Sequence, residues 1–133
     1  GHYNLMDDAN VPSLLSLPWL GWCDKKDPLY LNTRRFILSK KNPFYFEGSA
    51  ARGIGSPHTP EGYIWHIGLT MQGLTSADEE ERASLLETLV STDAGCEVMH
   101  EGFHSSDPAR FTREWFAWAN SLFALYVLDL KKF

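Results

Sequence analysis

The feature that most constrains this chain is a repeated order of segments. A polar loop leads into a stretch that is apolar on nearly all sides, and a turn and an amphipathic stretch follow it. The expected apolar helices are 11–20, 61–74 and 113–130, and the amphipathic helices between them are 28–39 and 77–91. A helix that is apolar all round is buried, whereas an amphipathic helix covers a core. This order predicts a helical-hairpin repeat with an inner and an outer layer.

Short sequence signals mark helix starts. Asp27-Pro28 and Asp107-Pro108 each place an aspartate N-cap before a proline at the first helical position. Ser76-Ala77-Asp78-Glu79 has the spacing of a capping box, in which the serine caps the helix and the glutamate reaches back. The long loop 40–62 contains one β-like run, Phe44-Tyr45-Phe46. We therefore expect an all-α fold with at most a short hairpin near that run.

Composition narrows the class of protein. A chain of 133 residues is at most one domain, and an apolar content of 44% predicts a packed core. The formal charge of −5 argues against a nucleic-acid partner, which requires clustered Lys and Arg. No apolar run approaches the ~18 residues of a membrane-spanning helix, and no signal peptide is present. Cys23 and Cys96 fit no metal-binding spacing, and we expect buried free thiols.

The segment Met99–His104, MHEGFH, allows two chemistries for Glu101. As H-E-x-x-H it matches the zinc-peptidase pattern, in which His100 and His104 bind the metal from one helical turn. Gly102 inside that turn and the missing third ligand weigh against this reading. Alternatively, Glu101 is a base that activates water, its pKa tuned by His100 and an aromatic wall.

The repeat places further polar residues near Glu101. Asp8, His58 and Glu101 precede the three apolar helices, whose N-termini are expected to point one way and so to gather the polar loops at one end. His58, flanked by Pro57 and Pro60, is held by a rigid loop. A third hypothesis is a non-catalytic helical binding module, in which these residues merely cap helices. The candidate site consists of Asp7, Asp8, Asn10, His58, His100, Glu101 and Arg113.

Several strings in this chain resemble a known family. The chain is similar throughout to the C-terminal third of glycoside hydrolase family 125, a family of exo-acting α-1,6-mannosidases on an (α/α)6 barrel. The resemblance rests on these strings, in order: MDDANVPSLLSLP, NTRRFILS, NPFYFEG, GIGSPHTPEGYIW, TDAG, MHEGF and DPARFTREWFAWANSLF.

The resemblance implies a mechanism and a partner. It implies hydrolysis with inversion at the anomeric carbon, without a metal ion or other cofactor, and Glu101 takes the place of the family's general base. The general acid, an aspartate, is expected upstream of this chain, so Asp7 and Asp8 would line or brace the sugar site. Residues 1–133 would then be the C-terminal fragment of a single (α/α)6 domain, with about five helices of twelve. The implied partners are α-1,6-linked mannosides and the upstream remainder of the catalytic domain, without which the fragment is expected to be inactive.

Overall fold

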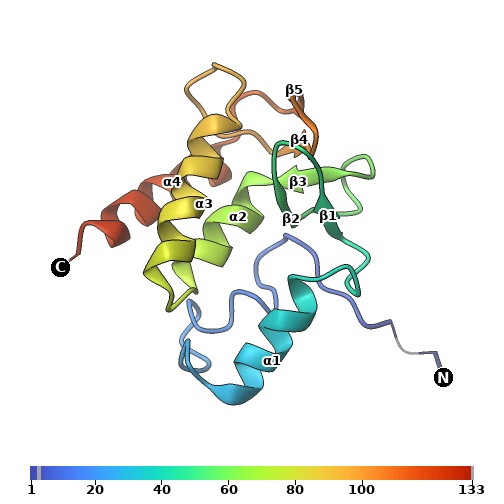
Figure 1. The fold of residues 1–133 in the computed structure, drawn as a ribbon, viewed down its shortest axis with the longest axis vertical. Coiled ribbons are helices and arrows are strands. Elements are labelled where there is room, and N and C mark those ends of the chain that lie inside the picture. The colour runs from blue at the N-terminus through green and yellow to red at the C-terminus, as the bar shows by residue number, and fades with distance from the viewer. Residues whose placement is uncertain (3, 133) are drawn as a thin grey trace.

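The computed structural model describes residues 1–2 and 4–132, which form helices and short strands (Figure 1). The helices of this described part are α1 (Pro28–Ile37), α2 (His66–Leu74), α3 (Glu79–Ser91) and α4 (Ala117–Leu130). Its strands are β1 (Tyr45–Glu47), β2 (Arg52–Ile54), β3 (Tyr63–Trp65), β4 (Gly102–His104) and β5 (Asp107–Thr112).

The prediction of an all-α, partial (α/α)6 fold is wrong for this chain. Beside the antiparallel hairpin β1-β2, which falls on the predicted β-like run, a second antiparallel sheet has the order β3-β4-β5. Fully buried Phe103 lies at its centre, opposite Ile64 on one side and Phe111 on the other. Cross-strand apolar and aromatic pairs of this kind stabilise a sheet. Residues 63–65 and 102–112 are therefore strands where a helix and a loop were expected.

The predicted first helix, 11–20, is also wrong, because the segment forms a series of turns. Ser13 and Ser16 account for this conformation. The Ser13 N–H donates to Ser16 Oγ at 2.8 Å, and that hydroxyl donates to the Ser13 carbonyl at 2.8 Å. Such local side-chain bonds compete with helical hydrogen bonding. Pro12 and Pro18 remove two further backbone donors.

Of the predicted helix starts, one is confirmed and two are wrong. Asp27 caps α1 and accepts from the N–H groups of Leu29 and Tyr30 at 2.8 and 3.2 Å. The cap of α3 is Asp78 rather than Ser76. Asp107-Pro108 opens β5, where Asp107 Oδ1 accepts from the Ala109 N–H at 3.2 Å. An aspartate that binds the N–H two residues ahead serves a turn as well as a helix.

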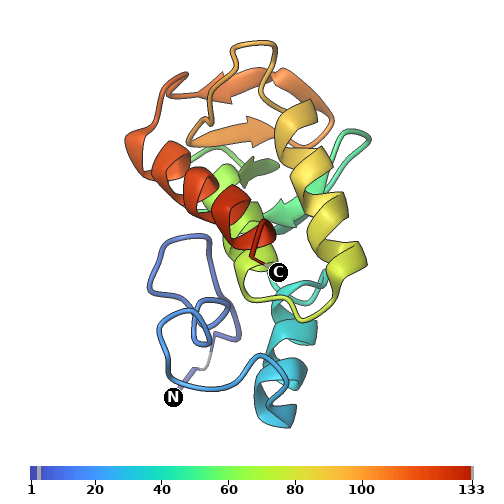
Figure 2. The same ribbon diagram turned by 90° about the vertical axis from the view of Figure 1, so that its left-hand side faces the viewer.

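Helix α2 is the centre of the core. It packs against both α3 and α4, and eight of its nine residues are buried (Figure 2). The sequence predicted that 11–20, 61–74 and 113–130 lie side by side in one layer. This layer of three helices is wrong, because 11–20 forms no helix, although α2 and α4 do pack together. Sheet β3-β4-β5 lies at one end of these helices, because β3 leads directly into α2 and β5 precedes α4. None of the helices in residues 4–132 has the length and apolar character that a membrane crossing requires. Cys23 and Cys96 are free, and both are half-buried.

Candidate functional site

Glu101 lies at the sheet end of the helices, directly before β4. Its side chain is 14% exposed, and its Oε2 is 3.1 Å from Arg113 Nε, on the segment between β5 and α4. Arg113 adopts the left-handed backbone region with φ 47°, and its guanidinium lies 5.5 Å from the centroid of the Phe116 ring. Among the described residues, no side-chain hydrogen bond to the Glu101 carboxylate accompanies this ion pair. One carboxylate oxygen is thus oriented by a cation while the other stays available.

The backbone leading to Glu101 is held at three successive peptide groups. The Met99 N–H donates to Asn120 Oδ1 at 3.0 Å, and the His100 N–H donates to His66 Nδ1 at 2.8 Å. The Glu101 N–H donates to the Thr112 carbonyl at 3.2 Å. These partners belong to α4, α2 and β5 respectively. The loop is therefore fixed by three separate elements rather than by its own turns.

His100 supports this loop from beneath. Its side chain is fully buried and stacks on Phe111 with the ring centroids 4.1 Å apart. Its Nδ1 is 2.6 Å from the Glu114 carbonyl oxygen and its Nε2 is 3.0 Å from the Asp93 carbonyl oxygen. Both partners are acceptors, so the ring donates to both only when each nitrogen carries a proton. The structure places His100 behind Glu101 and away from the surface.

His66, which the sequence reasoning missed, lies next to His100. It is fully buried, with its ring centroid 5.4 Å from that of His100 and 4.8 Å from that of Phe103. Burial, and secondarily the charge of His100, lower the pKa of His66 to about 3. The imidazole of His66 is therefore neutral at physiological pH. The available signal was its position inside an otherwise apolar helix.

The predicted polar residues near the N-terminus form a second cluster with Ser56. Asp8 Oδ2 accepts from Asn10 Nδ2 at 2.8 Å and from Ser56 Oγ at 3.1 Å. The His58 N–H donates to Ser56 Oγ at 3.3 Å, and the His58 side chain is exposed. Asp8, Asn10 and His58 are thus brought together, as the sequence predicted, but through a serine that it did not single out.

A contact path joins this cluster to Glu101. The ring centroids of His58 and Trp65 are 6.3 Å apart. Trp65 Nε1 donates to Thr59 Oγ1 at 2.9 Å. Trp65 pairs with Gly102 across β3 and β4, and a side chain at Gly102 would contact the indole at about 3.2 Å. The glycine after Glu101 therefore provides the space into which Trp65 packs. Thr59 and Gly102, the residue after Glu101, therefore both lie against one tryptophan.

Asp7 has a different environment from its neighbour Asp8. Its Oδ2 accepts from the Leu15 N–H at 3.2 Å, and its own N–H donates to Asn42 Oδ1 at 3.2 Å. Burial raises the pKa of Asp7 above its usual value, while the backbone bond from Leu15 opposes the shift. Asp7 thus braces the turns of 11–20, and the structure does not join it to Asp8's side-chain partners.

The geometry of the zinc alternative is not formed. His100 and His104 do not share a helical turn, since residues 102–104 are strand β4. Both ring nitrogens of His100 face carbonyl oxygens, and His104 Nδ1 accepts from the Ser106 N–H at 3.2 Å. In the part of the chain that the structure describes, no three His, Cys, Asp or Glu side chains are grouped to hold a metal.

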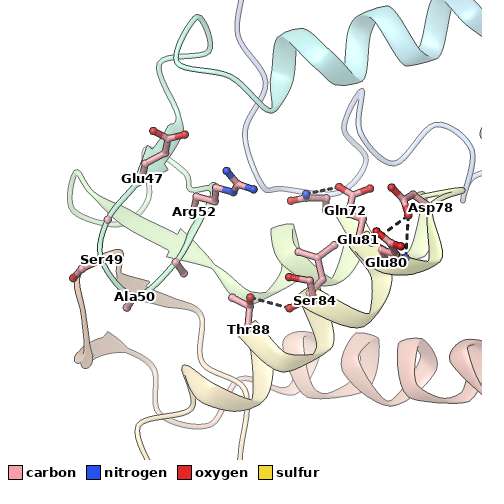
Figure 3. Close-up of a pocket in the computed structure, with 13 residues that line it drawn as sticks. Glu47, Ser49, Ala50, Arg52, Gln72, Asp78, Glu80, Glu81, Ser84 and Thr88 are labelled. Carbon is pink, nitrogen blue, oxygen red and sulfur yellow. Dashed lines mark hydrogen bonds between the residues drawn. The ribbon is translucent and has the colours of Figure 1, made fainter.

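A groove of about 710 Å³ lies elsewhere, between α3 and the β1-β2 hairpin (Figure 3). Its described lining is polar: Glu47 and Arg52 come from the hairpin, and Glu80, Ser84 and Thr88 come from α3. It includes none of the predicted site residues among those that the structure places. Size alone therefore does not mark the site.

Glycoside hydrolases use Asp and Glu side chains as catalytic acids and bases, and the Glu101 carboxylate is a group of that kind. Comparison with known families agrees with this class. The chain belongs to the metal-independent alpha-mannosidase family GH125, which matches residues 1–128. The resemblance seen in the sequence is thereby confirmed.

Two relatives show how much of a family member this chain represents. A metal-independent α-mannosidase of Streptococcus pneumoniae, solved in a non-productive substrate complex with α-1,6-mannobiose, is 52% identical. It superposes with a TM-score of 0.95 over 98% of this chain and 30% of its own. The meiotically up-regulated gene 157 protein of Schizosaccharomyces pombe is 51% identical over 131 residues, which is 98% of this chain and 26% of that protein. The chain thus spans between a quarter and a third of the relatives it matches.

Proposed function

We propose that this chain is the C-terminal part of an inverting exo-α-1,6-mannosidase and that Glu101 is its general base. The observation that carries the proposal is the position of the Glu101 carboxylate. Arg113 orients one of its oxygens at 3.1 Å, and three elements hold the peptide groups that lead to it. Membership of a family of metal-independent α-mannosidases supports a reaction carried by carboxylates rather than by a metal.

The proposed reaction requires a second carboxyl group. In an inverting glycosidase the base deprotonates a water that attacks the anomeric carbon, while an acid protonates the departing oxygen from the opposite side of the sugar. The two carboxyl groups lie ~6.5–9.5 Å apart, which leaves room for the water. Glu101 would take the proton from water. We assign the acid to the upstream remainder of the catalytic domain, because Asp7 and Asp8 are engaged in bonds of their own.

The remaining predicted residues divide by their surroundings. His58 and Arg113 are exposed. Asp8 and Asn10 are half-buried, and they are joined to His58 through Ser56. These four residues are the proposed sugar contacts. His100 is fully buried, which favours a supporting role over the predicted contact with substrate. The mannobiose in the S. pneumoniae complex supports an α-1,6-linked mannoside as substrate.

An apolar surface on α4 supports the proposal that this chain completes a larger domain. Trp118, Leu125 and Leu128 are 38%, 49% and 59% exposed on one side of the helix. Exposed apolar groups that lie together commonly mark a surface that another element covers. We propose that the upstream part of the domain packs there, and that the 133-residue chain alone is inactive because it lacks the acid.

The test is Glu101→Gln in the complete catalytic domain. This change keeps the shape of the side chain but removes the basic oxygen, so turnover should fall by about 10²–10⁴ while mannoside binding persists. Glu80→Gln, which neutralises a carboxylate in the groove beside α3, is the matched control and should leave turnover unchanged.

Release of mannose from an α-1,6-mannobioside measures turnover, and NMR identifies the anomer of the first product. Nearly unchanged turnover in the Gln variant would remove Glu101 from the role of base and leave the non-catalytic module as the better hypothesis. An α-configured first product would exclude inversion. Activity of the 133 residues alone would show that the acid lies within them.

A further inference from the structure

We infer that His66 and Asn120 are positioning residues for Glu101. Their side chains are neutral, each has fixed donor and acceptor atoms, and together they hold the two peptide groups that flank Met99. The inference rests on the proposed role of Glu101 and adds residues that do not themselves touch substrate. His66 comes from α2 and Asn120 from α4, the two helices packed at the centre of the fold. The backbone just before Glu101 is therefore held by the core, while the Glu101 N–H itself is held by the Thr112 carbonyl of β5.

The hydrogen bonds of His66 define one tautomer. Thr92 Oγ1 donates its proton to the Thr88 carbonyl at 2.8 Å, so its oxygen accepts from His66 Nε2 at 3.0 Å. The other ring nitrogen, Nδ1, then has no proton and accepts from the His100 N–H at 2.8 Å. The buried imidazole is fully paired in the neutral Nε2–H form, and it offers an acceptor to the Glu101 loop.

Asn120 holds the adjacent peptide group from the other side. Its Oδ1 accepts from the Met99 N–H at 3.0 Å, and its Nδ2 donates to the Met99 carbonyl at 3.0 Å. Nδ2 also donates to the Phe116 carbonyl at 2.9 Å, which ties the amide to the first turn of α4. Both polar groups of Met99 are thus bound to one side chain whose orientation its own helix fixes.

The consequence for catalysis follows from distance. Glu101 is one residue beyond the Met99–His100 peptide group, whose N–H is bound by His66 and whose carbonyl is bound by Asn120. A displacement of about 1 Å in a reacting group can lower a rate by ~10², because proton transfer depends on a short, aligned contact. Loss of either side chain would also leave a buried polar group without its partner, so the loop would shift to satisfy it.

The experiment compares variants at His66 in the complete catalytic domain. His66→Phe keeps a ring but removes the acceptor, whereas His66→Asn places an amide oxygen near the position of Nδ1. We expect His66→Phe to lower kcat by about 10–10² while KM changes by less than about threefold, and His66→Asn to recover most of the loss. Asn120→Leu should repeat the kcat effect. Tyr126→Phe removes another buried hydrogen bond, 2.6 Å to the Arg82 carbonyl, and serves as the control for stability alone.

A purely structural role would lower stability in His66→Phe and Tyr126→Phe alike, with kcat of the folded fraction unchanged. That result, or failure of His66→Asn to recover kcat, overturns the inference. The wild-type protein gives a check that requires no variant. Its ¹⁵N imidazole spectrum should show His66 with Nδ1 unprotonated and Nε2 protonated from pH 8 to pH 5, and the opposite tautomer would overturn the inference. If His66→Phe keeps full kcat while Glu101→Gln is inactive, only this inference is wrong. If Glu101→Gln is active, the proposed function is wrong, and this inference is wrong with it.

Discussion

The buried, neutral His66 makes a quantitative prediction about stability and pH. Its pKa is about 3 in the folded chain because burial, and then the charge of His100, disfavour the imidazolium. In the unfolded chain the pKa returns to about 6.5. Below that pH the unfolded state therefore binds a proton that the folded state does not. The stability from this group is complete above pH 6.5 and is lost as the pH falls from 6.5 towards 3.

The magnitude follows from proton linkage. Each pH unit between the two pKa values reduces the free energy of unfolding by about 1.4 kcal/mol. Between pH 7.5 and pH 4.5 the expected loss from His66 is about 2.5 kcal/mol. Over this range the folded state binds almost no proton at His66, because its pKa of about 3 lies well below 4.5.

The assay is urea unfolding of the complete domain and its His66→Asn variant at both pH values. His66→Asn should be less stable at pH 7.5, yet it should lose about 2.5 kcal/mol less on acidification, because asparagine does not titrate. Titrating groups that are remote from His66 cancel in this difference. Equal losses in both proteins would refute the view that His66 is buried and uncharged in the native state.

Two further predictions concern backbone positions. Gly73→Ala should lower the free energy of unfolding by about 1–3 kcal/mol, because the added methyl group meets the ring of buried Tyr126, and wild-type stability by urea unfolding would contradict that packing. Arg113→Ala should be about 1 kcal/mol less stable than Arg113→Gly, since both remove the guanidinium but only glycine adopts the left-handed region without strain. Equal unfolding midpoints for that pair would argue against the backbone conformation described.

Helices with clear local signals were predictable from the sequence. Asp27-Pro28 predicted the start of α1, and the Ser76–Glu79 signal placed the start of α3 within two residues, although Asp78 rather than Ser76 is the cap. The segment 11–20 failed because its apolar content outweighed Ser13 and Ser16, whose side chains compete for backbone groups. The pattern of apolar residues therefore predicts a helix poorly where side-chain hydrogen bonds to the local backbone decide the conformation.

Sheet β3-β4-β5 could not be predicted from the sequence, because β3 and β4 have only three residues each and are far apart along the chain. Three residues show no period of two, and Phe103 becomes a strand residue only when Ile64 and Phe111 lie on both sides of it. Of the candidate site, Glu101 and Arg113 were both named from the sequence, but the ion pair between them was not foreseen. His66 was missed because a histidine within an apolar helix resembles any other core residue.

Helix α4 carries two features that meet within one turn. Trp118 belongs to the exposed apolar side, and Asn120, two residues later, binds both polar groups of Met99. A surface that docked on α4 would therefore lie against the same turn that holds the backbone before Glu101. The bonds to Met99 are already formed while this side of α4 is uncovered, so the local shape of the Glu101 loop is encoded within these 133 residues.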